Sequence, residues 1–198
     1  MKKVFLFDLG NVLAYPIDSK LLYQKLNCKI PYKEFEKYWL GNDLIIKAHK
    51  GLVSDDISIK ELLNYCKTNL SVEDFYNVYN NLDTSLFLDT VEIINKLKAN
   101  GYRVGLLSNL RLMDYDRYKE KIEEIDFDYL FLSYEMNSLK PDDKIFKKVI
   151  ESCNCKPSEI VFFDDNERNV IAANRNGINC YKTSGYNIKK VFEEIFNV

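Results

Sequence analysis

The sequence predicts an α/β protein built on a parallel sheet, with a group of helices inserted after the first strand. Three observations carry this prediction. The apolar run Val4–Phe7 lies close to the N-terminus, residues 17–83 show helical spacing, and strand-like and helix-like segments alternate from about residue 89 onward. Such alternation is typical of parallel sheets with right-handed crossovers.

The first strand ends in a carboxylate. The run Val4–Phe7 is rich in β-branched and aromatic residues, as expected for a strand buried on both faces of a parallel sheet. Asp8 follows at once, at the carboxyl end of this strand, where open α/β sheets bind their ligands. An aspartate at a strand end is often only a turn residue, so a functional role needs support from other segments.

Residues 17–83 are expected to form four or five helices, because their apolar residues recur at helical spacing. Gly41 and Gly51 interrupt this pattern and separate individual helices. Ser71 is an expected N-cap, and its spacing to Asp74 approximates a capping box.

The rest of the chain is expected to alternate between the two kinds of element. A helix over 89–100 ends at Asn100-Gly101, since glycine is favoured just after a helix. The later strands are expected at 102–107, 129–132, 160–164 and 178–182, and the later helices at 114–124, 142–152, 167–176 and 187–196.

Composition excludes several classes of protein. The chain has 198 residues, is 46% hydrophobic and carries a net charge of −2, which suits one core domain with a small insertion. No basic stripe indicates nucleic-acid binding, and no apolar run has the length of a membrane span. The first strand follows the initial Met so closely that no signal peptide is expected, which predicts a cytoplasmic protein.

The cysteines are expected to be free thiols. Their number is five, and disulfides are rare in proteins of the cytoplasm. Cys153 and Cys155 have the spacing of a metal or redox pair, but neither a second pair nor a histidine lies nearby in the sequence.

Three further segments carry polar residues at the ends of strands or the beginnings of helices. They are Leu106–Asn109, Leu139–Asp142 and Val161–Asn166. Together with Asp8 they supply a nucleophilic carboxylate, a hydroxyl, an ammonium and a second pair of carboxylates. Converging carboxylates repel each other unless a hard cation lies between them, and Mg²⁺ suits such a site because it keeps room for water and substrate phosphate. A hydroxyl and an ammonium facing the remaining phosphate oxygens are what phosphoryl transfer requires.

The four segments, in this order and spacing, resemble the haloacid dehalogenase-like (HAD) hydrolase superfamily, and the resemblance covers the whole chain. Phe7–Leu13 and Phe162–Asn166 are most similar to the branch that contains bacterial α-D-glucose-1-phosphate phosphatases. The resemblance implies a Rossmann-like three-layer core, whose parallel five-stranded sheet has the order 5-4-1-2-3, plus an inserted all-helical cap. The expected domains are a core of residues 1–14 and 85–198 and a cap of residues 15–84.

The resemblance also assigns roles in catalysis and substrate binding. Asp8 matches the nucleophile that becomes a phosphoaspartate. Ser108 matches the hydroxyl that binds the phosphate, and Asn109 helps to shape the pocket. Lys140 matches the cation that pairs with the nucleophile and the phosphoryl group.

The same resemblance implies a Mg²⁺ site. Asp8 and the backbone carbonyl of Gly10 would be two ligands. Asp165 aligns best with the acidic ligand, because Ala172-Ala173 then falls at the family's small-residue positions. Asp164 is the second candidate, with a hydrogen bond to the lysine or to a metal-bound water as its alternative role.

Gly10 departs from the family pattern. Most phosphatases of the superfamily have a second aspartate here, which acts as general acid and base, and the loss of such a group costs about 10²–10⁴ in rate. The glucose-1-phosphate branch has the same glycine, so the departure does not imply an inactive protein. Without this acid, substrates whose leaving group departs well unaided are favoured, such as a sugar 1-phosphate, unless a cap residue supplies the proton.

Three other residues have two interpretations each. His49 is the single histidine and either reaches the pocket as a substituted acid or lies at a solvated helix end. Arg111 closely follows Ser108 and either contacts substrate or lies on the surface. Trp39 either belongs to the core of the cap or forms a platform for a sugar.

The sequence thus predicts a Mg²⁺-dependent phosphatase for a small phosphorylated metabolite. Two alternatives stay open at this point. One is a metal-independent 2-haloacid dehalogenase, against which the pair Asp164-Asp165 argues, because uncompensated carboxylates oppose a halide site. The other is a catalytically weak protein that binds a phosphorylated metabolite, which Gly10 alone suggests. The oligomeric state is left open.

Overall fold

A computed structural model describes residues 4–196 of the chain. Its centre is a parallel sheet of five strands in the order β3-β2-β1-β4-β5. The strands are β1 (Val4–Phe7), β2 (Arg103–Ser108), β3 (Tyr129–Leu132), β4 (Ile160–Asp164) and β5 (Asn179–Lys182). The predicted fold class and strand order are therefore confirmed, since 5-4-1-2-3 is the same order counted from the other edge of the sheet. As expected, β1 is the central strand, and it pairs in parallel with β2 on one side and β4 on the other.

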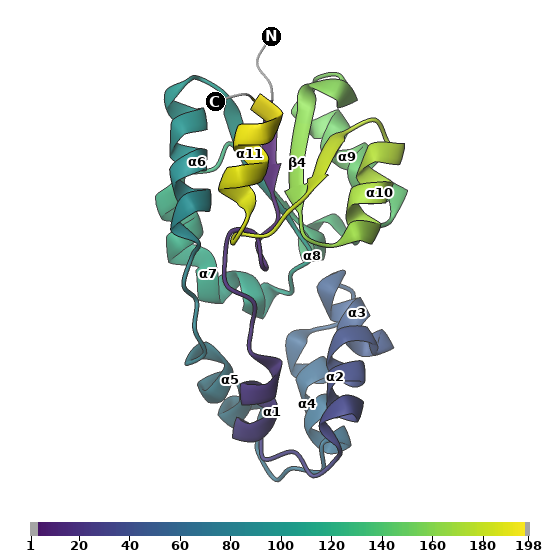
Figure 1. The fold of residues 1–198 in the computed structure, drawn as a ribbon. Coiled ribbons are helices and arrows are strands. Elements are labelled where there is room, and N and C mark those ends of the chain that lie inside the picture. The colour runs from purple at the N-terminus through teal and green to yellow at the C-terminus, as the bar shows by residue number, and fades with distance from the viewer. Residues whose placement is uncertain (1–3, 197–198) are drawn as a thin grey trace.

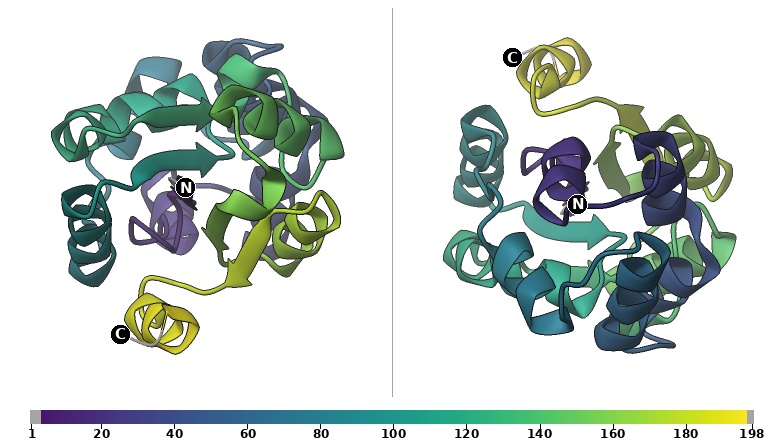
Figure 2. Two further views of the ribbon diagram at one scale, coloured as in Figure 1. Left: turned by 90° about the horizontal axis from the view of Figure 1, so that it is seen from above. Right: turned by 90° about the horizontal axis from the view of Figure 1, so that it is seen from below.

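Helices cover both faces of this sheet and make three layers (Figures 1 and 2). Side chains of β1 alternate between the two faces: Phe5 and Phe7 belong to one apolar cluster, and Val4 and Leu6 to the other. The first cluster is shared with α6, α7 and α11, and the second with α9 and α10. These helices are α6 (Leu88–Ala99), α7 (Leu112–Ile125), α9 (Asp143–Cys153), α10 (Glu167–Arg175) and α11 (Ile188–Phe196).

Five helices after β1 form a separate bundle, which lies beyond the carboxyl ends of the strands (Figure 1). They are α1 (Ser19–Lys25), α2 (Tyr32–Gly41), α3 (Asp43–His49), α4 (Asp55–Tyr65) and α5 (Val72–Asn80). The bundle has its own apolar core, which includes Phe35, Trp39 and Phe75. Ser71 is the N-cap of α5 and forms the expected capping box with Asp74.

Two stretches of chain connect the bundle to the sheet, and they run side by side. The backbone N–H of Tyr15 donates to the carbonyl of Ser85, at 3.0 Å, and the N–H of Phe87 donates to that of Leu13, at 2.9 Å. These hydrogen bonds hold together the points at which the chain enters the bundle and leaves it.

The helix positions agree with the spacing of the apolar residues, with two additions. The short helices α8 (Ser133–Met136) and η1 (Pro157–Glu159) carry too few residues for a periodic pattern to indicate them. Helix α7 begins two residues earlier than expected, because Asp114 closes a capping box with the backbone of Arg111. All five cysteines are free thiols. Within residues 4–196, we find no helix with both the length and the apolar character that a membrane crossing requires.

Candidate active site

The candidate nucleophile lies at the carboxyl end of β1, in the middle of the sheet. The backbone of Asp8 still pairs with its neighbour strand, since its N–H donates to the carbonyl of Phe163 at 2.9 Å. Three donors reach Oδ1 of Asp8: the backbone N–H of Leu9 at 2.8 Å, the hydroxyl of Ser108 at 2.7 Å and the ammonium of Lys140 at 3.0 Å. No hydrogen bond from a described residue reaches Oδ2. One oxygen is thus held in place and the other is left for a ligand or a reaction.

Lys140 lies between two carboxylates. Its Nζ is 2.7 Å from Oδ2 of Asp164 and also donates to the carbonyl of Leu107 at 2.9 Å. Burial alone would lower the pKa of Lys140, but the carboxylates of Asp164 and Asp8 raise that pKa above its usual value. The lysine therefore stays charged in a nearly inaccessible position, where it is 3% exposed.

Asn109 fixes the segment that carries this lysine. The N–H of Lys140 donates to the side-chain oxygen of Asn109, and the side-chain amide of Asn109 donates to the carbonyl of Lys140, both at 2.9 Å. The two residues are 31 positions apart in the sequence. This reciprocal pair ties the loop after β2 to the segment before α9.

The two aspartates after β4 differ in their environments. Asp164 is completely buried, and both its oxygens accept hydrogen bonds, from Lys140, the backbone N–H of Asn166 and the side-chain amide of Asn169. Asp165 is partly exposed, and the one hydrogen bond that reaches it from a described side chain comes from Asn11, at 2.9 Å. The free carboxylate oxygens thus belong to Asp8 and Asp165, whereas Asp164 binds the lysine.

An acidic cluster of Asp8, Asp164 and Asp165 brings one oxygen from each carboxylate within 4.8 Å of the others. All its donor atoms are hard carboxylate oxygens, which suit Mg²⁺ better than a softer metal. Burial raises the pKa of Asp8 to about 6, although the charge of Lys140 opposes the shift. A cation at this cluster would offset the cost of ionising Asp8, so the residues present fit a divalent metal.

A cavity of about 450 Å³ opens over these residues, between the sheet and the helical bundle. Its floor includes Asp8, Ser108, Lys140 and Asp165, all of which the sequence singled out. The backbone of Gly10 also lies there, exposed and outside the left-handed region, and a Cβ built on it meets no atom within 4 Å.

The side of the cavity that faces the bundle carries two residues whose positions the sequence left open. Arg111 is only 2% exposed, so the interpretation of Arg111 as a surface residue is wrong. His49 is partly buried and lines the same cavity, rather than ending α3 in solvent. Trp39 belongs to the core of the bundle, as one interpretation expected, and it also lines the cavity. Its role as a platform for a sugar stays a prediction.

Three residues of this environment were missed by sequence reasoning. Asn11 binds Asp165, and its φ of 59° is one that asparagine tolerates. Asp114 and Tyr79 lie on the other side of the cavity, joined by a hydrogen bond of 2.5 Å. The Arg111-x-x-Asp114 spacing at the beginning of a helix is the signal that could have indicated Asp114.

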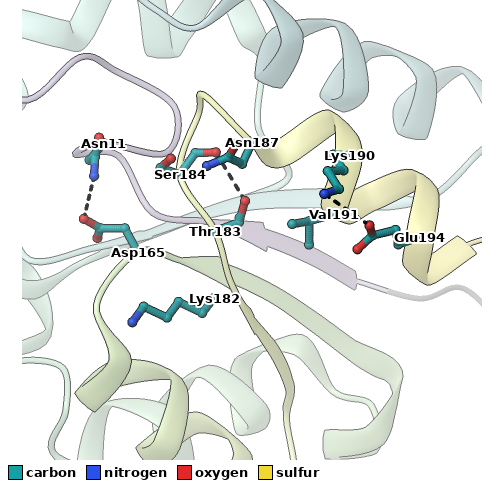
Figure 3. Close-up of a pocket in the computed structure, with 9 residues that line it drawn as sticks. All are labelled: Asn11, Asp165, Lys182, Thr183, Ser184, Asn187, Lys190, Val191 and Glu194. Carbon is teal, nitrogen blue, oxygen red and sulfur yellow. Dashed lines mark hydrogen bonds and ion pairs between the residues drawn. The ribbon is translucent and has the colours of Figure 1, made fainter.

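A second cavity, of about 570 Å³, adjoins the first and shares Asn11 and Asp165 with it (Figure 3). Figure 3 shows Asn11 and Asp165 at one side and helix α11, with Lys190 and Glu194, at the other. Its lining includes neither Asp8, Ser108 nor Lys140. Of the two cavities, only the first is lined by Asp8, Ser108 and Lys140.

The family model for haloacid dehalogenase-like hydrolases matches residues 2–177. The chain belongs to the haloacid dehalogenase-like hydrolases. The resemblance inferred from the four sequence segments is therefore confirmed at the level of the superfamily, and the chain is a hydrolase. The branch of the glucose-1-phosphate phosphatases is not confirmed and stays a prediction.

Relatives within this superfamily include phosphatases. A D-ribitol-5-phosphate phosphatase of Bacteroides thetaiotaomicron is 28% identical over 180 residues, which cover 86% of each chain. A sesquiterpene phosphatase of Aspergillus oryzae is 31% identical over 87 residues, and the match spans 44% of that relative's length. A crystal structure of a HAD family enzyme from B. thetaiotaomicron, in complex with magnesium and inorganic phosphate, superposes with a TM-score of 0.78 at 26% identity. That match covers 93% of this chain and 96% of the crystallised one.

Proposed function

We propose that this HAD-like hydrolase is a Mg²⁺-dependent phosphatase, which hydrolyses a small phosphorylated metabolite through a phosphoaspartate on Asp8. The observation that carries the proposal is the arrangement around this carboxylate. Ser108 and Lys140 hold one of its oxygens, the other accepts no hydrogen bond from a described residue, and Asp8 lines the cavity together with Asp165. The phosphatases among the relatives, and the phosphate and magnesium in the B. thetaiotaomicron structure, support the same chemistry.

In the proposed reaction, a carboxylate oxygen of Asp8 forms a bond to phosphorus while the bond between phosphorus and the ester oxygen breaks. The departing alkoxide takes its proton from water. The hydroxyl of Ser108 and the ammonium of Lys140 are placed to donate to phosphoryl oxygens once substrate displaces their contacts with Asp8. Water then attacks the phosphoaspartate, which releases phosphate and restores the carboxylate. Asp8, Asp165 and the carbonyl of Gly10 would hold Mg²⁺, which supplies charge neutralisation and orientation of the phosphoryl group.

Asp164 has a positioning role in this proposal. Both its oxygens are engaged by Lys140, Asn166 and Asn169. We therefore prefer Asp165 over Asp164 as the acidic metal ligand. The role of Asp164 is to keep Lys140 charged and aimed at the phosphoryl position.

The helical bundle fits the role of a cap. Its helices lie over the carboxyl edge of the sheet, and Trp39 and His49 from the bundle line the cavity above Asp8. We propose that residues 15–84 are the cap and that residues 1–14 and 85–198 are the core, of which residues 1–3 and 197–198 lie outside the described residues. Such a cap would exclude water from the site and contact the leaving group.

The dehalogenase alternative fits the site less well. Besides Asp8, the acidic cluster contains Asp165, whose charge no described cation neutralises within hydrogen-bonding distance. A halide leaving group beside this carboxylate would be repelled. We therefore place the metal-dependent reaction first.

The test is hydrolysis of p-nitrophenyl phosphate by the purified chain, with Mg²⁺ and with EDTA. Turnover that requires Mg²⁺ is expected. The Asp8→Asn variant should lose this turnover while it keeps its circular dichroism spectrum, because the nucleophile is removed but its shape is kept. Multiple turnover by a pure Asp8→Asn sample would refute covalent catalysis at this residue, and metal-independent release of halide from a 2-haloacid would favour the dehalogenase.

A further inference from the structure

Arg111 is a buried cation, and one nitrogen of its guanidinium has no hydrogen-bond partner among the described residues. Its Nε and Nη2 each lie 3.0 Å from an oxygen of Asp114, and its guanidinium lies over the ring of Trp39, 4.4 Å from the centroid. The remaining nitrogen, Nη1, is buried and has no hydrogen-bond partner among the described residues. Arg111 also lines the cavity above Asp8. A buried N–H group without a partner is costly, and because Arg111 lines the cavity, a ligand bound there could supply the acceptor that Nη1 lacks.

Arg117 lies in helix α7, six residues after Arg111, which caps the N-terminus of this helix, and it serves as a comparison for Arg111. Its guanidinium lies over the ring of Tyr79 at 4.4 Å, and its Nη2 donates to the carbonyls of Leu82 and Asp83. Arg117 also has buried nitrogens without partners, but it does not line the cavity. Two similar arginines thus differ in their access to the site, which makes Arg117 a matched control.

In the lining of the cavity, the charges of Arg111 and Asp114 compensate each other, and Asp55, which does not line the cavity, adds a negative charge close to Arg111. Burial alone would raise the pKa of Asp114, but the guanidinium of Arg111 holds that pKa far below its usual range, so Asp114 stays ionised. Burial and the charge of Arg111 lower the pKa of His49 below 6.5, although Asp114 opposes the shift. His49 is therefore neutral at pH 7, and this end of the cavity carries one positive and one negative charge.

The neutral imidazole of His49 has one nitrogen that can accept a hydrogen bond, and His49 lines the same cavity as Arg111. Nδ1 of His49 lies 2.8 Å from the carbonyl of Ile45, which assigns the proton to Nδ1. Nε2 is then an acceptor, and it lies 3.9 Å from Oδ2 of Asp114, at the Arg111–Asp114 pair. A donor, Nη1 of Arg111, and an acceptor, Nε2 of His49, thus belong to one end of the cavity. A hydroxyl group can use both, since its oxygen accepts and its hydrogen donates.

We propose that Arg111, Asp114 and His49 form the subsite for the leaving group, and that this subsite selects an uncharged, hydroxylated carbon chain, as in a sugar or alditol monophosphate. The inference rests on the proposed phosphatase activity and adds the substrate class. A second anionic group would meet the buried carboxylate of Asp114, and an ammonium group would meet Arg111. An aliphatic chain would leave Nη1 without a partner.

Three matched substrates test this inference: D-ribitol 5-phosphate, pentyl phosphate, which lacks the hydroxyls, and 5-phospho-D-ribonate, which adds a carboxylate. With Mg²⁺, we expect kcat/KM for the ribitol ester to exceed both others by roughly tenfold or more, because an unpaired buried donor penalises the analogue that lacks its partner. A preference for the ribonate would identify an anion subsite, and a preference for the pentyl ester an apolar one; either result overturns the inference.

The Arg111→Lys variant separates recognition from a structural effect. It keeps a cation beside Asp114 but loses Nη1. We expect kcat/KM for the ribitol ester to fall by roughly tenfold or more, chiefly through KM, with a much smaller fall for the pentyl ester. The Arg117→Lys control should leave the ratio of the two substrates unchanged. An equal loss on both esters in Arg111→Lys would show a merely structural role and would overturn the inference.

Failure of this inference is distinguishable from failure of the proposed function. If p-nitrophenyl phosphate is hydrolysed but none of the three matched esters is, the phosphatase proposal stands and the subsite inference falls. If p-nitrophenyl phosphate is not hydrolysed either, the phosphatase proposal fails and titration calorimetry with the same esters decides the subsite. Weaker binding of ribitol 5-phosphate in Arg111→Lys, without a matching change for pentyl phosphate, supports the subsite; unchanged binding of both overturns it.

Discussion

The ammonium of Lys140 lies 3.0 Å from Oδ1 of Asp8, at the end of β1, and it links this residue to Asp164, the last residue of β4. The same nitrogen binds Asp164, at 2.7 Å, so one buried cation serves two buried carboxylates. Removal of the lysine charge would leave both carboxylates without a counter-charge in the interior, which would lower the free energy of unfolding. The reactive end of the site is therefore also a point on which stability depends.

Replacement of this lysine tests both roles together. The Lys140→Gln variant should lose roughly 10²–10³-fold in kcat, because one donor to the transferring phosphoryl group is missing. Breaking a buried ion pair should also lower the free energy of unfolding by about 3–5 kcal/mol in the absence of metal. Enzyme kinetics and urea denaturation measure the two effects, with the exposed Lys144→Gln as control. Wild-type activity in Lys140→Gln would contradict the assignment.

Metal binding should be visible without turnover. A ligand that binds only the folded state stabilises it by about 2.7 kcal/mol at 100 times its Kd. Saturating Mg²⁺ should therefore raise the melting temperature of the wild-type chain by roughly 5–10 °C. The Asp165→Asn variant should lose most of this shift, whereas the exposed Asp116→Asn should keep it. If Asp165→Asn shows the full Mg²⁺-induced rise in melting temperature, Asp164 rather than Asp165 is the acidic ligand.

Gly10 offers a gain-of-function prediction. Because no general acid stands at this position, sugar 1-phosphates should be hydrolysed faster than their 6-phosphate isomers, whose alcohol leaves less readily. Gly10 does not use a left-handed φ and a Cβ there meets no neighbour within 4 Å, so Gly10→Asp should fold normally. This variant should raise the rate on 6-phosphates most, as measured by phosphate release. Equal rates on both isomers, with no gain in a folded Gly10→Asp, would point to an acid in the cap, with His49 the first candidate.

The pH dependence of stability should report the environment of His49. Its folded pKa lies below 6.5, owing to burial and to Arg111, with Asp114 and the carbonyl of Ile45 as opposing neighbours. At this residue the unfolded chain consequently binds more protons than the folded one just below pH 6.5. The contribution of His49 to the free energy of unfolding should therefore fall as the pH drops through this window, whereas Asp8, whose pKa is raised to about 6, contributes in the opposite sense. In His49→Gln the melting temperature should fall less between pH 7 and pH 5.5. Identical slopes in the two proteins would contradict a buried, neutral His49.

Much of the candidate site could be predicted because it follows from the ends of strands. Asp8, Ser108 and Asp165 each lie at or just beyond the carboxyl end of a parallel strand, and such ends meet at one edge of the sheet. Lys140 was indicated by its place before a helix and by the family resemblance. The cap helices were also visible, since their apolar spacing is independent of how the bundle docks.

The sequence by itself determined the order of strands and helices, the family and the polar groups at the sheet edge, because short-range periodicity and strand-end chemistry are local properties. Only the tertiary structure decided which partner each polar group has. Asp164 binds Lys140 while Asp165 keeps a free oxygen, although the two are neighbours in the chain. Arg111 is buried beneath Trp39, a residue 72 positions away, because the bundle folds back over the sheet. Contacts of this kind depend on how two apolar cores dock against each other, and no local pattern in the chain encodes that arrangement.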